Sequence, residues 1–263
     1  MSKKYNVCLS THQGKVRADN EDNFAINTVV RNIEDKEKNL RGNNAEEPLV
    51  CSVFDGMGGE SSGEIASKIA ADNAKVIYEN IKNSVGNIEE NLSDFVTKTN
   101  NTIVNVIGND SKSRGGTTFV TAIFDRGFVF TYSLGDSRMY VYKNGVLTQI
   151  TNDHTLAMKK YRANIYTLEE AKNSNDSHKL TAFLGVDLGE QEIVAESYPV
   201  FELNKGDRIL LCSDGLYDMC TDDEISEIMS KNSKTTSLKL VNRALKNGGS
   251  DNITCMVIDC TEE

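Results

Sequence analysis

Aspartates recur along the chain at points where runs of apolar residues begin or end. Asp55 follows the apolar run 49–54 and precedes Gly56, and Asp214 follows the run 208–213 in the same way. The same placement recurs at three further positions, Asp22, Asp136 and Asp251. Any one of these residues on its own most often only stabilises a turn, because aspartate and glycine are ordinary turn residues. The same chemistry at five predicted strand ends indicates a shared role.

Carboxylates that converge on one edge of a sheet repel each other unless cations hold them together. Sites made only of oxygen ligands select hard ions such as Mg²⁺ or Mn²⁺ rather than zinc. These aspartates, together with Asp218 one helical turn after Asp214, could hold two such ions about 3.5–4 Å apart. Two ions at that spacing activate water and orient a phosphoryl group for in-line displacement. We therefore expect a site for divalent cations.

Two other motifs fit the sequence less well. The strand–glycine–helix pattern at 53–65 resembles a dinucleotide-binding loop, but Ser61 stands where that loop requires its third glycine. An EF-hand calcium loop that begins at Asp19 fails, because Phe24 occupies the sixth position, where glycine is required. The cation site at the strand ends therefore remains the stronger interpretation.

Short apolar runs predict the strands that would position these aspartates. The predicted strands are 23–30, 49–54, 117–124, 128–134, 138–142, 146–150, 193–201, 208–213 and 253–260. Asn144-Gly145, between two of these runs, is a strong hairpin signal. Residues 31–48 are almost entirely polar and lack periodicity, so we expect an exposed loop there.

Helical periodicity predicts two pairs of helices, at 63–81 with 88–106 and at 222–231 with 236–246. Hairpins in the middle of the chain favour antiparallel sheets, and helices grouped in pairs are typical of α+β rather than alternating α/β proteins. Neither an internal repeat nor a linker is visible. We therefore expect one α+β domain over residues 1–263.

The composition limits the function classes. The 263 residues are 38% hydrophobic and include 29 basic against 39 acidic residues, a net charge of −10 that argues against nucleic-acid or anionic-membrane partners. No apolar run reaches the roughly 20 residues of a membrane helix, and no secretory signal is visible. Six scattered cysteines without a C-x-x-C pair favour a reducing compartment. A cytoplasmic location is expected.

Seven short blocks occur in order over the whole chain. They are GKVRADNED at 14–22, VFDGMGG at 53–59, GGTT at 115–118, LGDSR at 134–138, TNDH at 151–154, LCSDG at 211–215 and GSDN at 249–252. Together they resemble the metal-dependent serine/threonine protein phosphatases of type 2C. The Asp-Gly-Met-Gly-Gly variant in a short chain is similar to the bacterial branch of that family.

The resemblance implies a four-layer α+β fold, in which two packed antiparallel sheets carry pairs of helices on both outer faces. It also implies a binuclear metal site at one end of this sandwich. Asp55 would bridge the two ions and the Gly56 carbonyl would bind one of them, while Asp214 and Asp251 would complete the shell of the other. Glu21 and Asp22 would act at the first ion, partly through water.

The same resemblance assigns roles around the ions. Arg17 corresponds to the residue that binds the substrate phosphate, a bidentate task that suits a guanidinium group. Asp136 and Asp218 correspond to a pair that holds a third, more labile ion in bacterial members. Residues 155–180 correspond to a mobile flap over the site, which bears on substrate choice.

One position departs from the family's pattern. Animal members carry histidine at the position of Met57, where it is taken as the general acid, and a thioether cannot deliver a proton. The proton for the leaving oxygen must then come from water at the ions or from another group. His12 and His154 lie near the matching blocks, but a structural hydrogen bond is the commoner role of a lone histidine.

We therefore expect an enzyme that hydrolyses phosphoserine and phosphothreonine on proteins, with a hydroxide bridging two Mn²⁺ or Mg²⁺ ions as nucleophile. Its expected partners are phosphorylated proteins and a bacterial serine/threonine kinase whose action it opposes, and it is expected to be a monomer. The alternative is a catalytically inactive member used as a binding or regulatory module. Such modules usually lose metal carboxylates, whereas every matching position here remains acidic.

Overall fold

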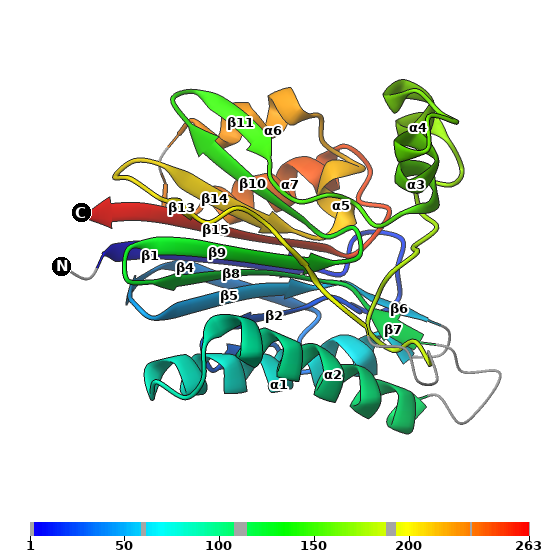
Figure 1. Ribbon diagram of the computed structural model, residues 1–263. Helices are drawn as coiled ribbons and strands as arrows, with labels where there is room; N and C mark the ends of the chain where they lie inside the picture. Colours follow the sequence, from blue (N-terminus) through cyan, green and yellow to red (C-terminus); the bar gives the residue numbers. More distant parts are fainter. Residues whose placement is uncertain (1–2, 59–61, 108–114, 188–192, 232, 263) are drawn as a thin grey trace.

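Two antiparallel sheets lie face to face in the middle of the protein (Figure 1). They are seen in a computed structural model that describes residues 3–58, 62–107, 115–187, 193–231 and 233–262. The first sheet has the strand order β11-β10-β14-β15-β1-β4. Its strands are β1 (Lys4–His12), β4 (Glu37–Glu46), β10 (Arg138–Lys143), β11 (Val146–Gln149), β14 (Arg208–Cys212) and β15 (Ile253–Glu262).

The second sheet has the order β12-β9-β8-β5-β2-β3, and β13 also pairs with β9. Its strands are β2 (Asn23–Ile26), β3 (Val29–Val30), β5 (Leu49–Phe54), β8 (Phe119–Asp125), β9 (Phe128–Leu134), β12 (Glu196–Ser197) and β13 (Phe201–Glu202). A separate two-stranded ribbon of β6 (Gly56–Gly58) and β7 (Gly115–Thr117) continues beyond its end.

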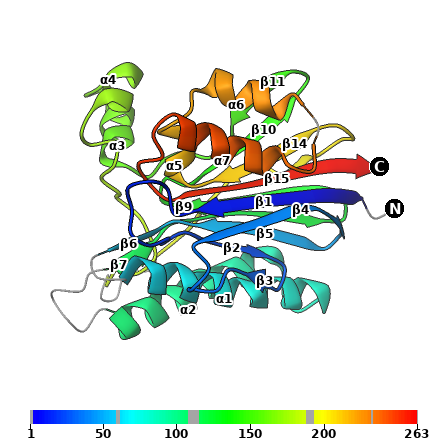
Figure 2. The same cartoon turned by 180° about the vertical axis from the view of Figure 1, so that it is seen from behind.

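Helices cover the outer face of each sheet (Figures 1 and 2). On the second sheet lie α1 (Ser62–Lys82) and α2 (Ile88–Ile107), and on the first lie α5 (Asp214–Tyr217), α6 (Asp222–Met229) and α7 (Thr236–Lys246). The helix α1 buries alanines spaced four residues apart, Ala66, Ala70 and Ala74, which lets its backbone approach the sheet closely. The expected α+β sandwich with helices on both outer faces is confirmed.

Apolar side chains fill the three spaces between these four layers. Strand alternation divides β14 between two of them, because Ile209 and Leu211 face the other sheet while Leu210 and Cys212 face the helices. Each such fully buried aliphatic side chain contributes roughly 1.5–3 kcal/mol to folding. The strands that carry the aspartates at their ends are thus held rigidly by packing on both faces.

The ends of these strands gather at one end of the sandwich, opposite the chain termini (Figure 1). The ribbon β6–β7 lies at that end, and so do two short helices that stand apart from the sandwich, α3 (Leu156–Arg162) and α4 (Leu168–Asn173). These helices form the helical part of residues 155–180, which we call the flap. None of the helices in the described part of the chain is long and apolar enough to cross a membrane.

The prediction of a loop at 31–48 is wrong, because most of this segment is the edge strand β4. β4 pairs with β1 from Lys4↔Glu46 to His12↔Glu37. Edge strands are commonly rich in charged residues, which discourage pairing with other chains, so a polar sequence is compatible with this position. Only Leu40 and Ala45 of β4 pack against the core between the sheets. The strand therefore lacks the apolar alternation by which the sequence signals strands.

Two other predicted strands are shorter than expected. The run 23–30 is two strands, β2 and β3, joined by a turn in which Asn27 has a φ of 52°. The run 193–201 contains only the two-residue strands β12 and β13, separated by a segment that includes Pro199. Proline lacks the amide hydrogen that a continuous strand would need. In both cases local turn chemistry overrides the apolar pattern.

Candidate functional site

A pocket of about 680 Å³ opens where the strand ends meet, between the two sheets and the flap. Every predicted site residue lines it except Asp22. The residues that line the pocket are Arg17, Glu21, Asp55, Gly56, Met57, Gly58, Thr118, Asp136, His178, Leu180, Asp214, Asp218, Met219, Ser250 and Asp251. Gly59, the last residue of the second sequence block, lies outside the described residues. The acidic residues come from loops of both sheets, so the pocket depends on the stacking of the sandwich.

Asp55 is fixed by hydrogen bonds at the start of the ribbon β6–β7. Its amide donates to the Thr118 hydroxyl (3.2 Å), and its carbonyl accepts from the Thr118 amide (2.9 Å) and the Thr117 hydroxyl (2.9 Å). The next residue must be glycine, because a Cβ on Gly56 would lie 2.2 Å from the Gly63 carbonyl oxygen. The second and third sequence blocks therefore act together to place the Asp55 carboxylate.

The electrostatics of this pocket disfavour simultaneous ionisation of all its carboxylates. Burial, and then repulsion from Asp214, raises the pKa of Asp55 well above its ordinary value. Burial and then the charge of Asp136 do the same for the pKa of Asp214. The pKa of Asp136 itself rises to about 7, mainly through burial and then through Asp153. Divalent cations are the natural means to keep such a cluster ionised at neutral pH.

Asp22 lies behind the pocket and is fully buried. Its Oδ2 accepts a hydrogen bond from the Ser213 hydroxyl (2.7 Å), whereas Oδ1 has no hydrogen-bond partner. Burial raises the pKa of Asp22 to about 6, although the bond from Ser213 opposes the shift. A buried carboxylate oxygen without a partner is costly and needs an explanation. A hydrated cation in the adjacent pocket would provide one, so the donor set fits the ions that the sequence predicts.

Glu21 and Arg17 lie at the rim of the pocket. Burial raises the pKa of Glu21 to about 7, although the positive charge of Arg17 lowers it. The guanidinium Nη2 of Arg17 donates to Oδ2 of Asp251 (2.7 Å), and 54% of the arginine side chain is exposed. An exposed guanidinium that one carboxylate holds in place can use its remaining N–H groups to bind an incoming anion.

His178 is the pocket residue that sequence reasoning missed. It belongs to the flap, and its Nδ1 lies 3.6 Å from Oδ2 of Asp218. One ligand atom each from His178, Asp214 and Asp218 lie within 4.8 Å of one another. The sequence predicts that the flap covers the site, and His178 is the only histidine among residues 155–180. That prediction was the signal by which His178 could have been found.

The two histidines that the sequence offered as proton donors have structural partners instead. His12 Nδ1 accepts from the Gly14 amide (2.8 Å), and its Nε2 lies 3.0 Å from Glu37. His154 Nδ1 accepts from the Gly135 amide (3.0 Å), and its Nε2 lies 2.7 Å from Glu196. Neither residue lines the pocket. Both therefore take the structural role that was expected to be commoner.

Comparison with known proteins identifies the family of this chain. The model of the family "Protein phosphatase 2C" matches residues 38–247. The serine/threonine phosphatase stp of Listeria innocua is 32% identical over 258 residues, which cover 95% of this chain and 93% of that protein.

Solved structures lead to the same family. The crystal structure of the Mycobacterium tuberculosis serine/threonine phosphatase PstP/Ppp superposes with a TM-score of 0.80 at 27% identity, over 98% of this chain and all of that one. The catalytic domain of PstP in complex with two manganese ions superposes with a TM-score of 0.76 at 27% identity, with the same coverage. The chain therefore belongs to the protein phosphatase 2C family, as one of its bacterial phosphatases.

Proposed function

We propose that this phosphatase removes phosphate from phosphoserine and phosphothreonine residues of proteins, with Mn²⁺ or Mg²⁺ ions held in the pocket around Asp55 and Asp214. The observation that carries the proposal is the cluster of carboxylates from both sheets, two of which have pKa values well above the ordinary range because they are buried and lie beside other carboxylates. Further support comes from a structural relative that holds two manganese ions.

The residues divide among the ions as follows. Asp55 would serve both core ions, with the Gly56 carbonyl at one of them and Asp214 and Asp251 at the other. Glu21 and Oδ1 of Asp22 would act at the first ion, in part through water. Asp136 and Asp218 would hold a third ion more weakly. The support for this division is that all ligand atoms are oxygens, the donor type that Mn²⁺ and Mg²⁺ prefer.

The chemistry then divides between ions and side chains. When bound, the two core ions would lower the pKa of water so that it can act as the nucleophile at neutral pH, and would stabilise negative charge on the phosphoryl oxygens. Arg17 orients the phosphate through the two-pronged geometry of its guanidinium, and Asp251 holds that guanidinium at the rim. Met57 transfers no proton, since its thioether has none.

The proposed partners are phosphorylated proteins and the serine/threonine kinase that phosphorylates them, and we place the phosphatase in the cytoplasm as a monomer. All six cysteines are buried thiols, which suits a reducing compartment. The described residues that line the pocket include no phenylalanine, tyrosine or tryptophan on which a nucleic-acid base could stack.

The test is release of phosphate from a phosphothreonine peptide in the presence and absence of Mn²⁺. We expect activity that EDTA abolishes and Mn²⁺ restores, and a loss of at least about 100-fold in Asp55→Ala and Asp214→Asn, because metal-assisted steps lose most of their rate without the ligands. A matched control is Asp94→Asn, an exposed carboxylate of α2 paired with Lys98, which should retain full activity. Full activity in EDTA, or in Asp214→Asn, would contradict the proposal.

A further inference from the structure

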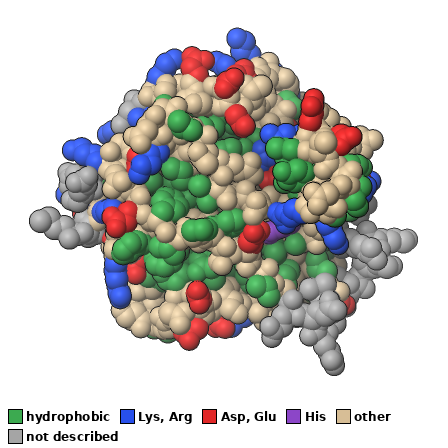
Figure 3. Space-filling model, turned by 45° about the horizontal axis from the view of Figure 1, so that its top comes forward, with side chains coloured by type: hydrophobic (Ala, Val, Ile, Leu, Met, Phe, Trp, Pro, Cys, Tyr) green, Lys and Arg blue, Asp and Glu red, His purple; other side chains and the backbone are tan. Residues whose placement is uncertain are grey.

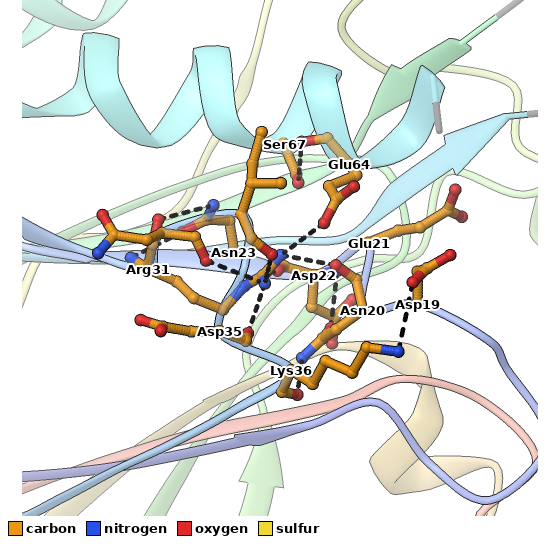
Figure 4. A network of polar contacts seen from close by, with 12 residues as sticks. Asp19, Asn20, Glu21, Asp22, Asn23, Arg31, Asp35, Lys36, Glu64 and Ser67 are labelled. Carbon is orange, nitrogen blue, oxygen red and sulfur yellow. Dashed lines mark hydrogen bonds and ion pairs between the residues drawn. The ribbon is translucent and has the colours of Figure 1, made fainter. Parts of the chain in front are cut away.

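Arg31 is a fully buried arginine directly after β3, in the segment that the sequence predicts as a loop. It donates hydrogen bonds to five backbone carbonyls (Figure 4). The distances are 2.8 Å from Nε to Asp22 O, 2.6 Å from Nη2 to Asn20 O, and 3.2, 3.2 and 2.6 Å from Nη1 to Asn32 O, Ile33 O and Asp35 O.

This guanidinium differs from an ordinary buried ion pair. Its ion pair among the described residues is a loose one, 3.9 Å from Nη2 to Glu64 Oε1. Burying a positive charge is costly, and burial lowers the pKa of Arg31 below its ordinary value. All three guanidinium nitrogens instead donate to main-chain carbonyls on both sides of the group. A lysine could not reproduce this pattern, since its single ammonium lacks the planar fork.

Two of those carbonyls flank Glu21, and the other side of the same segment is held by Asn252. Asn252 Oδ1 accepts from the Glu21 amide (2.7 Å), and its Nδ2 donates to Asp19 O (2.8 Å). Residues 19–22 form neither helix nor strand, so their backbone has no hydrogen-bond ladder of its own. Arg31 and Asn252 bind the backbone of this segment from opposite sides, and so supply hydrogen bonds that a strand or helix would otherwise provide.

We infer that Arg31 is a positioning residue for the metal centre, which presets the backbone of residues 20–22 so that Glu21 and Asp22 are placed for a divalent ion before the ion binds. The inference rests on the proposed metal-dependent function. Asn252 belongs to a sequence block of the family, whereas Arg31 lies outside all seven blocks. Its role follows from the carbonyls that surround it.

A second buried arginine serves as a matched control, which separates a positioning role at the metal centre from a purely structural role. Arg208 is also buried, pairs with Asp259 at 3.0 Å, and donates to the Met229 carbonyl. It contacts no residue of the proposed metal centre through these bonds. Arg208→Met should therefore lower the melting temperature without a change in the Mn²⁺ dissociation constant.

The test is titration calorimetry of Mn²⁺ binding to the full-length wild type, Arg31→Lys, Arg31→Met and Arg208→Met, with a thermal melt of each. We expect both Arg31 variants to bind Mn²⁺ about 10- to 100-fold more weakly, the usual effect of losing a group that orients metal ligands. We also expect the activity of Arg31→Lys to recover at saturating Mn²⁺. A folded Arg31→Lys with wild-type Mn²⁺ affinity would overturn the inference.

Hydrogen exchange in the wild type gives a second test that does not depend on the variants folding. The amides of residues 20–23 should be equally protected in the metal-free and the Mn²⁺-loaded protein. Protection that develops only when Mn²⁺ is added would overturn the inference and leave the proposed function intact. A wild type that binds no Mn²⁺ would instead overturn the proposed function, and this inference with it.

Discussion

At the scale of single residues, the site is a set of carboxylates whose charges oppose one another. Glu21, Asp22 and Asp136 have pKa values of about 7, 6 and 7, mainly because burial disfavours their charged forms. In an unfolded chain the same groups titrate near 4. The folded, metal-free protein therefore holds more protons than the unfolded chain between about pH 4 and pH 7, and folding is linked to pH.

The sign of this linkage gives a prediction. Since the folded state binds the extra protons, stability falls as pH rises from about 5 to 8. We expect the metal-free protein to lose at least about 3 kcal/mol of unfolding free energy over that range, measured by urea unfolding, because one pKa unit corresponds to about 1.4 kcal/mol. Carboxylates with lowered pKa values, such as Asp72, are ionised in both states there and do not contribute.

Two variants separate the site from the rest of the surface. Asp136→Asn should reduce the fall in stability between pH 5 and pH 8, whereas Asp94→Asn, on the exposed face of α2, should leave it unchanged. Saturating Mn²⁺ should also reduce the fall, because bound cations take the place of the protons. A metal-free protein that is more stable at pH 8 than at pH 5 would contradict the linkage.

At the scale of secondary-structure elements, Arg138 joins three of them around the pocket. Its guanidinium forms two hydrogen bonds to Asp153, at 3.0 and 2.6 Å, and lies 3.4 Å from the ring centre of Tyr217. The Tyr217 hydroxyl in turn donates to the Asp136 carbonyl (3.0 Å). β10, the segment that leads into the flap, and α5 are thereby fixed to one another, and with them Asp136.

Removing this link should cost stability as well as activity. We expect Arg138→Met to lower the unfolding free energy by about 3 kcal/mol, because it leaves the half-buried carboxylate of Asp153 without its guanidinium partner. Arg126 serves as the control, since it is 86% exposed and its ion pair with Asp125 is long, at 3.6 Å. Arg126→Met should change the unfolding free energy by no more than about 0.5 kcal/mol. Equal losses in the two variants, measured by urea unfolding, would contradict this account.

Elements with local signals were predictable, and those that depend on distant partners were not. The helix at 236–246 has the predicted limits, because its apolar stripe is complete and its buried face includes Leu240, Val241 and Ala244. β4 could not be found, because its strand state comes from pairing with β1 and its side chains carry little apolar periodicity. Arg31 was missed for a related reason, since its partners are carbonyls that any sequence possesses.

At the scale of the whole molecule, the net charge of −10 gains a more specific meaning. Seven acidic residues belong to the proposed metal centre, Glu21, Asp22, Asp55, Asp136, Asp214, Asp218 and Asp251. On the face seen in Figure 3, the remaining acidic side chains are interspersed with lysine and arginine. Bound divalent ions would offset much of the local surplus, so the working protein would be less acidic than its sequence.

The aspartate pattern predicts that strand ends converge, but it does not predict which strands lie next to one another. Asp55 follows a strand of the second sheet and Asp214 one of the first. They line the same pocket because the sheets stack with these ends together. The resemblance to a known family supplied that arrangement, whereas apolar periodicity supplied only the separate strands.

Whether these carboxylates hold divalent ions can be seen in an anomalous difference map from crystals of the Mn²⁺-loaded protein. We predict at least two peaks in the pocket, with Asp55 contacting both and with Asp214 and Asp251 contacting one of them. Crystals of Asp214→Asn should lose the peak at that side. A fully loaded wild-type crystal whose map has no peak beside Asp55 would contradict the account.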